Sequence, residues 1–213
     1  MKSAIIGAGT YGQVYFYYLK RAGIEVVAFV DDNREILGKE ILGVPVLCTT
    51  AELSVLQEKY GIEAVYCPIG NNDVRVRILE QAKAYGLKTP CFIDKSAEIA
   101  DDVTIGEGVY ILVRATVMPF VKLEDYVMLS MSCNIAHHSV LKKGTFISTG
   151  VNFGASIEAE EKSYVGIGAT IMTGLHRLGK SCLIGAGSVV VRDVPDNAVM
   201  AGVPAKVLKI KTN

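Results

Sequence analysis

Residues 123–153 read LEDYVMLSMSCNIAHHSVLKKGTFISTGVNF, and every sixth residue of this stretch, from Leu123 to Phe153, is a large aliphatic or aromatic side chain. The same spacing runs from Ile93 to Ile171, where every member except Ala159 is Val, Ile, Leu or Phe. One extra residue near Arg177 shifts the frame, which then resumes at Leu178, Ile184 and Val190.

A six-residue period excludes an α-helix and an ordinary strand, whose side chains repeat every 3.6 and 2 residues. The residue four places after each large one is Ala, Val, Cys, Ser or Thr, except at Ile157 and Leu175. This pattern is typical of a hexapeptide β-helix, in which the large side chain fills the interior and the small one lets the chain turn a corner. Three hexads close one triangular coil. We therefore predict an all-β parallel β-helix domain over residues 91–213, with 199–209 as a capping strand.

Residues 1–90 alternate short apolar stretches with stretches of helix length. Strands separated by helices imply right-handed βαβ units and a parallel sheet, so we predict an α/β Rossmann-like domain here. The expected strands are 3–6, 25–30, 44–48, 63–67 and 87–91, and the expected helices are 11–22, 51–60 and 73–85.

The composition excludes several classes of function. The 22 basic and 22 acidic side chains give a formal net charge of zero, which argues against nucleic acid as a partner. No apolar run approaches the roughly 18 residues of a membrane span, and the start MKSAIIGAGTYG is not a secretory leader. The five cysteines include no CxxC pair, so we expect reduced thiols rather than a disulfide or zinc framework. These features predict a cytoplasmic protein without a metal site.

A glycine loop follows the first predicted strand, with the sequence GAGTYG at residues 7–12. Such glycines permit a tight turn and let a phosphate approach the backbone N–H groups at a helix N-terminus. Asp31 ends the second strand, where a carboxylate can bind a ribose or a base. A second loop, 69–72, is expected at the same sheet edge. The pattern predicts a nucleotide site and fits NAD nearly as well as any other nucleotide. A glycine turn without a ligand stays an alternative.

Two of the three histidines, His137 and His138, are adjacent and occupy outward places in their hexad. His137 is therefore reachable by solvent and can serve as a general base near neutral pH; the alternative is a pair of ordinary surface residues. Cys133 occupies an inward corner place, so we expect it to be buried and exclude it as a nucleophile. No ligand spacing supports a metal site, and His176 is expected in an outward loop.

The combination of these two halves resembles the bacterial nucleotide-sugar acetyltransferases of the PglD/NeuD type. The resemblance covers essentially the whole chain and rests on the GxGxxG loop, the Asp31–Asp32 pair, IGNN at 69–72 followed by Arg75, the outward His137, and GVPAK at 202–206. It implies a left-handed β-helix that forms a homotrimer and binds acetyl-CoA in the groove between neighbouring helices. The first domain would hold the uridine diphosphate of a UDP-4-amino-4,6-dideoxy sugar, with no redox cofactor.

The resemblance also implies roles for individual residues. His137 corresponds to the catalytic base, and His138 replaces its usual acidic partner. A backbone N–H, that of Ala155 one coil further on, would donate to the oxyanion during direct transfer in a ternary complex. The remaining correspondences are Gly9, Thr10, Tyr11, Asp31, Asp32 and Gly70 at the nucleotide; Ser130, in place of an asparagine, near the sugar; Phe146, in place of a histidine, near the acetyl group; and Ile167, Gly185 and Ala186 along the CoA.

Three alternatives to N-acetylation stay open. The same groove and base would serve sugar O-acetylation or the transfer of a longer acyl chain. The replaced acidic partner is compatible with a non-catalytic scaffold trimer that binds a nucleotide sugar. An NAD-linked enzyme is suggested by the glycine loop alone.

Overall fold

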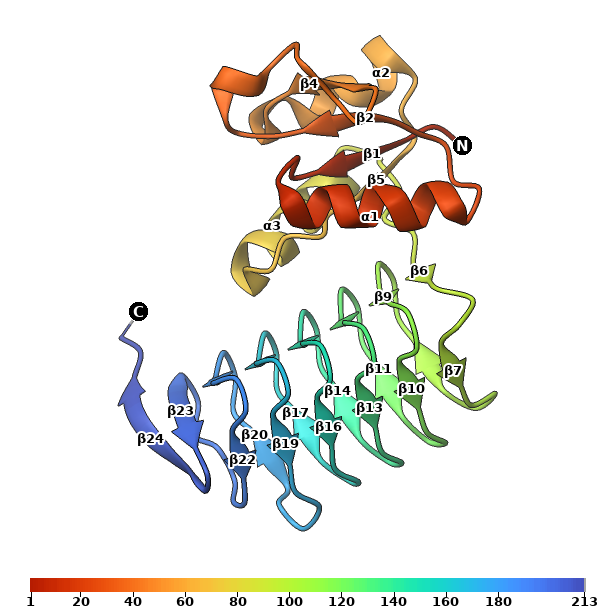
Figure 1. The fold of residues 1–213 in the computed structure, drawn as a ribbon. Coiled ribbons are helices and arrows are strands. Elements are labelled where there is room, and N and C mark those ends of the chain that lie inside the picture. The colour runs from red at the N-terminus through yellow and green to blue at the C-terminus, as the bar shows by residue number, and fades with distance from the viewer. Residues whose placement is uncertain (213) are drawn as a thin grey trace. The chain divides into compact units, whose positions relative to one another are not determined.

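The computed structural model describes residues 1–212, and the chain divides into two compact units (Figure 1). The first comprises Met1–Pro90 and the second begins at Cys91. Each unit has its own sheets and its own hydrophobic core.

The first unit is built on a five-stranded sheet in the order β3-β4-β2-β1-β5. All neighbouring pairs are parallel except β3 with β4. Strand β1, which lies between β2 and β5, is buried along its whole length, as expected for a parallel sheet covered on both faces. The strands are β1 Ser3–Ile6, β2 Val26–Val30, β3 Glu40–Ile41, β4 Val44–Cys48 and β5 Ala64–Tyr66.

Two of the predicted helices are continuous, α1 Thr10–Arg21 and α3 Asn72–Ala84. The predicted helix over 51–60 was wrong as a single element: a 3-10 helix, η2 Thr50–Val55, precedes the short α2 Leu56–Tyr60. The backbone departs from helical angles at Glu52, whose carboxylate accepts hydrogen bonds from the N–H and hydroxyl of Thr49. A further 3-10 helix, η1, spans Arg34–Ile36. The strand expected over 87–91 is reduced to one bridge between Lys88 and Ala64.

The second unit is a left-handed parallel β-helix of two-residue strands, which confirms the fold predicted from the six-residue period. Its first face comprises β6 Phe92–Ile93, β9 Tyr110–Ile111, β12 Met128–Leu129, β15 Phe146–Ile147, β18 Tyr164–Val165 and β21 Leu183–Ile184. The second face comprises β7 Glu98–Ile99, β10 Thr116–Val117, β13 Asn134–Ile135, β16 Asn152–Phe153, β19 Thr170–Ile171 and β22 Val189–Val190. The third comprises β8 Thr104–Ile105, β11 Lys122–Leu123, β14 Val140–Leu141, β17 Glu158–Ala159 and β20 Arg177–Leu178.

The C-terminal segment extends the first face. Strand β23 Ala198–Gly202 pairs in parallel with β21, and β24 Ala205–Ile210 returns antiparallel to β23. The capping strand predicted over 199–209 is therefore a pair of strands rather than one.

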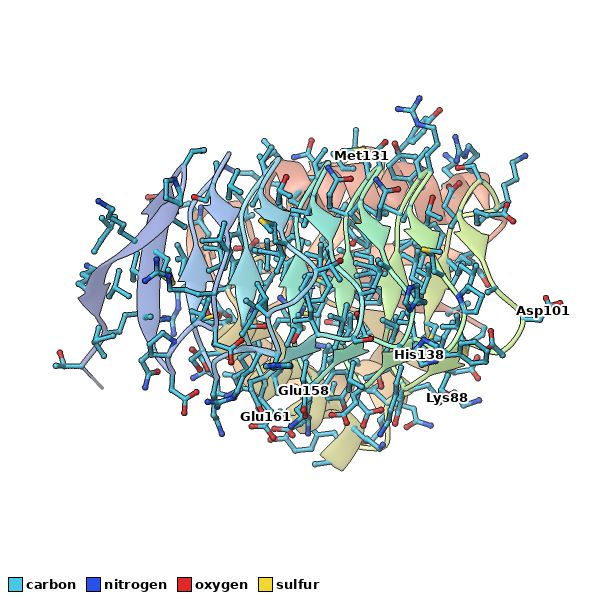
Figure 2. The ribbon with its side chains drawn as sticks, turned by 90° about the horizontal axis from the view of Figure 1, so that it is seen from below. Lys88, Asp101, Met131, His138, Glu158 and Glu161 are labelled. Atoms are coloured by element: carbon cyan, nitrogen blue, oxygen red, sulfur yellow. The ribbon has the colours of Figure 1, made fainter. Side chains whose placement is uncertain are left out.

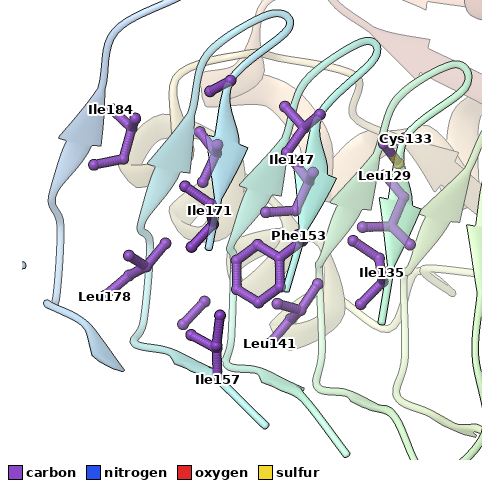
Figure 3. Close-up of a cluster of buried hydrophobic side chains, with 14 of the residues drawn as sticks. Leu129, Cys133, Ile135, Leu141, Ile147, Phe153, Ile157, Ile171, Leu178 and Ile184 are labelled. Atoms are coloured by element: carbon purple, nitrogen blue, oxygen red, sulfur yellow. The ribbon is translucent and has the colours of Figure 1, made fainter. Parts of the chain in front are cut away.

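The interior of the β-helix is filled by the second residue of each strand, as the hexad pattern predicts (Figure 3). Coils repeat every 18 residues, so that Leu129 pairs with Ile147 and Ile135 with Phe153. Burying one such side chain stabilises the fold by about 1.5–3 kcal/mol. In the first coil, Ile93 remains 42% exposed and Ile99 and Ile105 are only partly buried, because β6, β7 and β8 each have a neighbouring strand on one side.

The turns between faces form the edges of the prism. We call the turns from the first face to the second, such as 130–133, the first edge, and the turns from the second to the third, such as 136–139, the second edge. Many corner residues have left-handed backbone angles, among them His138 at φ 59°. The extra residue of the sequence lies in a loop at Gly174, whose φ of 102° suits glycine.

Candidate active site

The carboxyl ends of β1, β2, β4 and β5 meet at one edge of the sheet in the first unit. The glycine loop follows β1 there, and its tight turn depends on Gly12. A Cβ added at Gly12 would lie 1.8 Å from the carbonyl oxygen of Gly7, so any side chain would push the helix off the strand. Gly7 itself has φ 100°. The sequence requirement for these glycines is therefore steric.

The N-terminus of α1 is arranged to receive an anion. Gly9 is the N-cap residue and makes no side-chain capping bond, and the first turn contains no acidic residue. The N–H groups of the first helical turn lack intrahelical partners and carry the positive end of the helix dipole. Thr10 and Tyr11 begin this helix. A phosphate would satisfy these donors.

Asp31 and Asp32 are adjacent in the sequence, but their carboxylates accept hydrogen bonds from different parts of the first unit. The Asp31 carboxylate accepts hydrogen bonds from the N–H groups of Ala8 (2.7 Å) and Asn33 (2.9 Å), so it lies against the glycine loop. The Asp32 carboxylate accepts bonds from the N–H (2.7 Å) and hydroxyl (2.9 Å) of Thr50, where it caps the start of η2. Asp32 thus holds a neighbouring turn in place, a role that adjacency in the sequence does not reveal.

The second loop lies beside the first. β1 and β5 are neighbours, and a Cβ added at Gly7 would lie 3.5 Å from the side chain of Ile69. Arg75 is fully buried and donates a hydrogen bond to the carbonyl of Ile69 (2.9 Å), while the Asn71 side chain caps α3. Exposed Gly70 sits between these anchored residues. The strand order reverses direction between β1 and β5, which is where open α/β sheets bind ligands.

In the second unit, the histidines lie on the second edge in a stack of residues 18 apart. The N–H of His138 donates to the carbonyl of Pro119 (3.2 Å), and the N–H of Ser156 donates to the carbonyl of His137 (3.0 Å). Both imidazoles are exposed. Backbone bonds to the coils on either side therefore fix the positions of these two residues.

The two imidazoles contact each other. Their Nδ1 atoms are 3.0 Å apart, and the ring planes are perpendicular. The ring of Phe120, one coil earlier, lies 4.6 Å from that of His138. Figure 2 shows His138 on the second edge. This contact with Phe120 was not predicted, although the 18-residue repeat places Phe120 and His138 in register.

The Ala155 N–H, predicted as an oxyanion donor, lies one coil beyond His137, a spacing of about 4.8 Å. It donates a hydrogen bond to the hydroxyl of Thr173 at 3.2 Å. Thr173 was not singled out from the sequence, but it follows Ala155 by one 18-residue coil. A carbonyl oxygen that binds the Ala155 amide must compete with this hydroxyl.

The other residues predicted near the sugar and the CoA belong to the first face and first edge. Ser130 is buried, with its hydroxyl 3.0 Å from that of Thr149, and the buried ring of Phe146 packs against Tyr164 at 5.2 Å. Ile167 is 59% exposed, and Gly185 and Ala186 lie in the next turn of the same edge. The second face separates them from the histidines, as the positions of Met131 and His138 in Figure 2 illustrate.

A groove of about 510 Å³ runs along the second face. Ala136, directly before His137, lines it, with Met118 one coil earlier and Met172 two coils later. Two asparagines of the same face are joined by a hydrogen bond from Asn134 to Asn152 (2.9 Å). The groove therefore offers amide groups and apolar side chains beside the histidines.

The cysteines do not contribute nucleophiles to this edge. Cys133 is fully buried, as predicted, and burial raises the pKa of its thiol to about 12. Among residues 1–212, no cluster of His, Cys, Asp and Glu could hold a metal ion. No helix in the same range has the length and apolar character to cross a membrane.

Comparison with known proteins identifies the family. Residues 2–82 match the model of the PglD N-terminal domain. The structure is similar to the acetyltransferase domain of PglB from Neisseria gonorrhoeae, solved with acetyl coenzyme A, at 32% identity and TM-score 0.88 over 97% of this chain and 98% of that one. The chain belongs to the PglD/NeuD-type family of nucleotide-sugar acyltransferases.

A second relative of this PglD/NeuD-type protein was solved with both ligands. It is a histidine mutant of perosamine N-acetyltransferase from Caulobacter crescentus in complex with CoA and GDP-perosamine, with TM-score 0.91 and 28% identity over 98% of this chain and 97% of that one. The galactoside O-acetyltransferase of Escherichia coli is 33% identical over 113 residues, 52% of this chain. This match spans less than half, 46%, of that enzyme.

Proposed function

We propose that this protein transfers an acetyl group from acetyl-CoA to the amino group of a sugar carried on a nucleoside diphosphate, with His137 as the general base. The observation that carries the proposal is the position of His137, exposed on the second edge and one coil from the Ala155 amide. A base and an oxyanion donor at this spacing flank the place where an attacked thioester carbonyl would lie.

The nucleotide end of the substrate belongs on the first unit. The uncapped N-terminus of α1 would bind the diphosphate, and Asp31 and Gly70 would face the nucleoside across the β1–β5 crevice. The sequence resemblance favours UDP, whereas the Caulobacter crescentus relative was solved with GDP-perosamine. The experiment below therefore compares amino sugars linked to different nucleotides.

A complete site would need two copies of the chain. His137 and Ala155 lie on the second edge, whereas Ile167, Gly185 and Ala186 lie on the first, on the far side of the second face. Setting the second edge of one copy against the first edge of the next would bring both sets to one acetyl-CoA. A contact between two different patches closes into a ring when its rotation allows, and three copies make the homotrimer that we expect.

The proposed step conserves atoms and charge. As the sugar amine attacks the thioester carbonyl and the N–C bond forms, its proton passes to Nε2 of His137. The oxyanion of the tetrahedral intermediate accepts a hydrogen bond from the Ala155 N–H. The C–S bond then breaks, and the departing CoA thiolate takes the proton from the His137 imidazolium. Direct transfer between two bound substrates requires no acyl-enzyme, in agreement with the burial of Cys133.

Thiol release from acetyl-CoA with a panel of UDP-, GDP-, dTDP- and CMP-linked amino sugars tests the proposal. We expect turnover with at least one of them, and His137→Ala should lower kcat by about 10²–10⁴-fold, the usual scale of general-base catalysis. His176→Ala is the matched control, because this exposed histidine lies in the loop after Gly174 and should leave the rate unchanged. Full activity in His137→Ala would remove His137 as the base.

Sugar O-acetylation is the second candidate, because the second unit is similar to part of a galactoside O-acetyltransferase. Hydroxylamine cleaves an O-acetyl ester but leaves an amide intact, so treatment of the product separates the two reactions. If nucleotide sugars shift the melting temperature while no acyl-CoA supports turnover, the scaffold alternative is favoured instead. A shift with NAD and none with any nucleotide sugar would overturn the nucleotide-sugar site.

A further inference from the structure

The contact between His137 and His138 restricts where their protons can be. Two neutral imidazoles carry one ring proton each, and the two Nδ1 atoms are 3.0 Å apart. At this distance one Nδ1 must carry a hydrogen and the other must present its lone pair, because two lone pairs or two N–H groups would repel. The tautomers of the two rings are therefore coupled, and just one of the two Nε2 atoms has a free lone pair.

The choice between the two arrangements decides which ring can act as a base. If His138 donated through Nδ1, His137 would carry its proton on Nε2 and could not accept one there. We infer that His137 donates its Nδ1–H to Nδ1 of His138, which leaves Nε2 of His137 free to take the proton of the sugar amine. His138 is then a positioning residue, with its own proton on Nε2. This inference rests on the proposed function, since it takes His137 as the base.

The backbone around His138 holds this acceptor in place. The N–H of His138 donates to the carbonyl of Pro119, its φ is 59°, and its ring packs on Phe120. When His137 takes a proton, its Nδ1–H bond to His138 becomes charge-assisted and therefore stronger. A neutral imidazole thus fills the place of the acid that usually accompanies the base in this family.

The tautomers can be read directly, without substrate. In the intact protein labelled with ¹⁵N-histidine, long-range ¹H–¹⁵N correlation at neutral pH should show the proton of His137 on Nδ1 and that of His138 on Nε2. The single variants His137→Ala and His138→Asn assign the signals. The reverse pattern, with the His137 proton on Nε2, would overturn the inference whether or not the protein proves to be an acetyltransferase.

Two substitutions at residue 138 distinguish the effect of the hydrogen-bond acceptor from the effect of the positive φ. Asparagine and glycine both tolerate a positive φ, but asparagine keeps an acceptor, Oδ1, at the position of Nδ1. We expect His138→Gly to lower kcat by about 10- to 100-fold with little change in KM, and His138→Asn to recover most of that loss. In His138→Gly the tautomer preference of His137 should also disappear.

These outcomes distinguish failure of the inference from failure of the proposed function. Equal kcat values in His138→Gly and His138→Asn, or a His137 tautomer unchanged in His138→Gly, would show that His138 does not position the base. The expected tautomers in a wild-type protein that turns over no amino sugar would instead leave the coupled pair standing and contradict the acetyltransferase.

Discussion

At the scale of single residues, the Thr173 hydroxyl occupies the amide proposed as the oxyanion donor. Its Oγ1 accepts a hydrogen bond from the Ala155 N–H at 3.2 Å, and this N–H is the donor proposed for the oxyanion. A neutral hydrogen bond contributes about 1 kcal/mol net, so breaking it before each transfer raises the barrier by up to that amount. The 18-residue repeat determines the position of Thr173, one coil beyond Ala155.

Removing the hydroxyl of Thr173 should therefore speed the reaction. Thr173→Val keeps the branched shape but has no acceptor, and we expect kcat/KM to rise by up to about fivefold. Thr173→Ser, which keeps the hydroxyl, is the matched control and should resemble the wild type. Steady-state thiol release measures both. A slower Thr173→Val enzyme would mean that the hydroxyl itself donates to the oxyanion.

At the scale of elements, the carboxylate of Asp193 binds two consecutive backbone N–H groups at the end of the loop after Gly174. Oδ1 of Asp193 accepts hydrogen bonds from the N–H groups of His176 (2.6 Å) and Arg177 (3.1 Å). The bond from His176 is the main cause that holds the pKa of Asp193 below its ordinary value. Because Thr173 precedes this loop directly, Asp193 also helps to fix one end of the second-face groove.

Asp193→Asn should lower the free energy of unfolding by about 0.5–1 kcal/mol at neutral pH. This value is that of a hydrogen bond to a charged group, reduced because Asp193 is exposed to solvent. A carboxyl group whose pKa is depressed on folding stabilises the protein above its unfolded pKa, near 3.9, and loses that effect as the pH falls through the folded value. The difference from wild type in urea unfolding should therefore be full at pH 7 and should disappear as the pH falls through the folded pKa of Asp193. Exposed Asp101→Asn is the control and should show no such difference.

At the scale of the whole molecule, both edges expose apolar side chains that the proposed homotrimer would cover. Apolar side chains are exposed along the second edge and second face at Met118, Phe120 and Met172, and on the first edge at Ile167. Covering them on a neighbouring copy would remove apolar area from water on both sides of the contact. The same contact would complete the site.

Light scattering at micromolar protein should therefore give a mass about three times the 22.9 kDa of the chain. Ile167→Glu places a charge in the proposed contact, and it should yield a folded monomer without turnover. A sharper test co-expresses His137→Ala with Ala186→Tyr, each inactive alone. Activity should partly return, because some sites then join an intact His137 to an intact Ala186. A wild-type mass near one chain, or no recovery in mixed trimers, would contradict the shared site.

The elements divide into those that local pattern predicts and those that it does not. Strand β4 and helix α3 lie within one residue of their expected positions. The start of α3 is marked in the sequence by Asn71, whose side chain caps the helix. The segment 50–60 broke into two short helices instead, because Glu52 binds back to Thr49 and Asp32 holds Thr50. The second of these contacts comes from Asp32, which follows β2 and is distant in the sequence, so the apolar period of 50–60 does not reveal it.

The sequence by itself determined the β-helix and its register. An aliphatic residue every six positions allows one arrangement of short strands around a dry interior, and the repeat then stacks residues 18 apart, His137 with Ala155 among them. The tertiary structure alone decided how those stacked groups meet: the paired Nδ1 atoms of His137 and His138, and the Thr173 hydroxyl on the Ala155 amide. The physical reason is that such contacts depend on corner backbone angles and side-chain rotamers, which are fixed by hydrogen bonds between coils and leave no periodic signal in the chain.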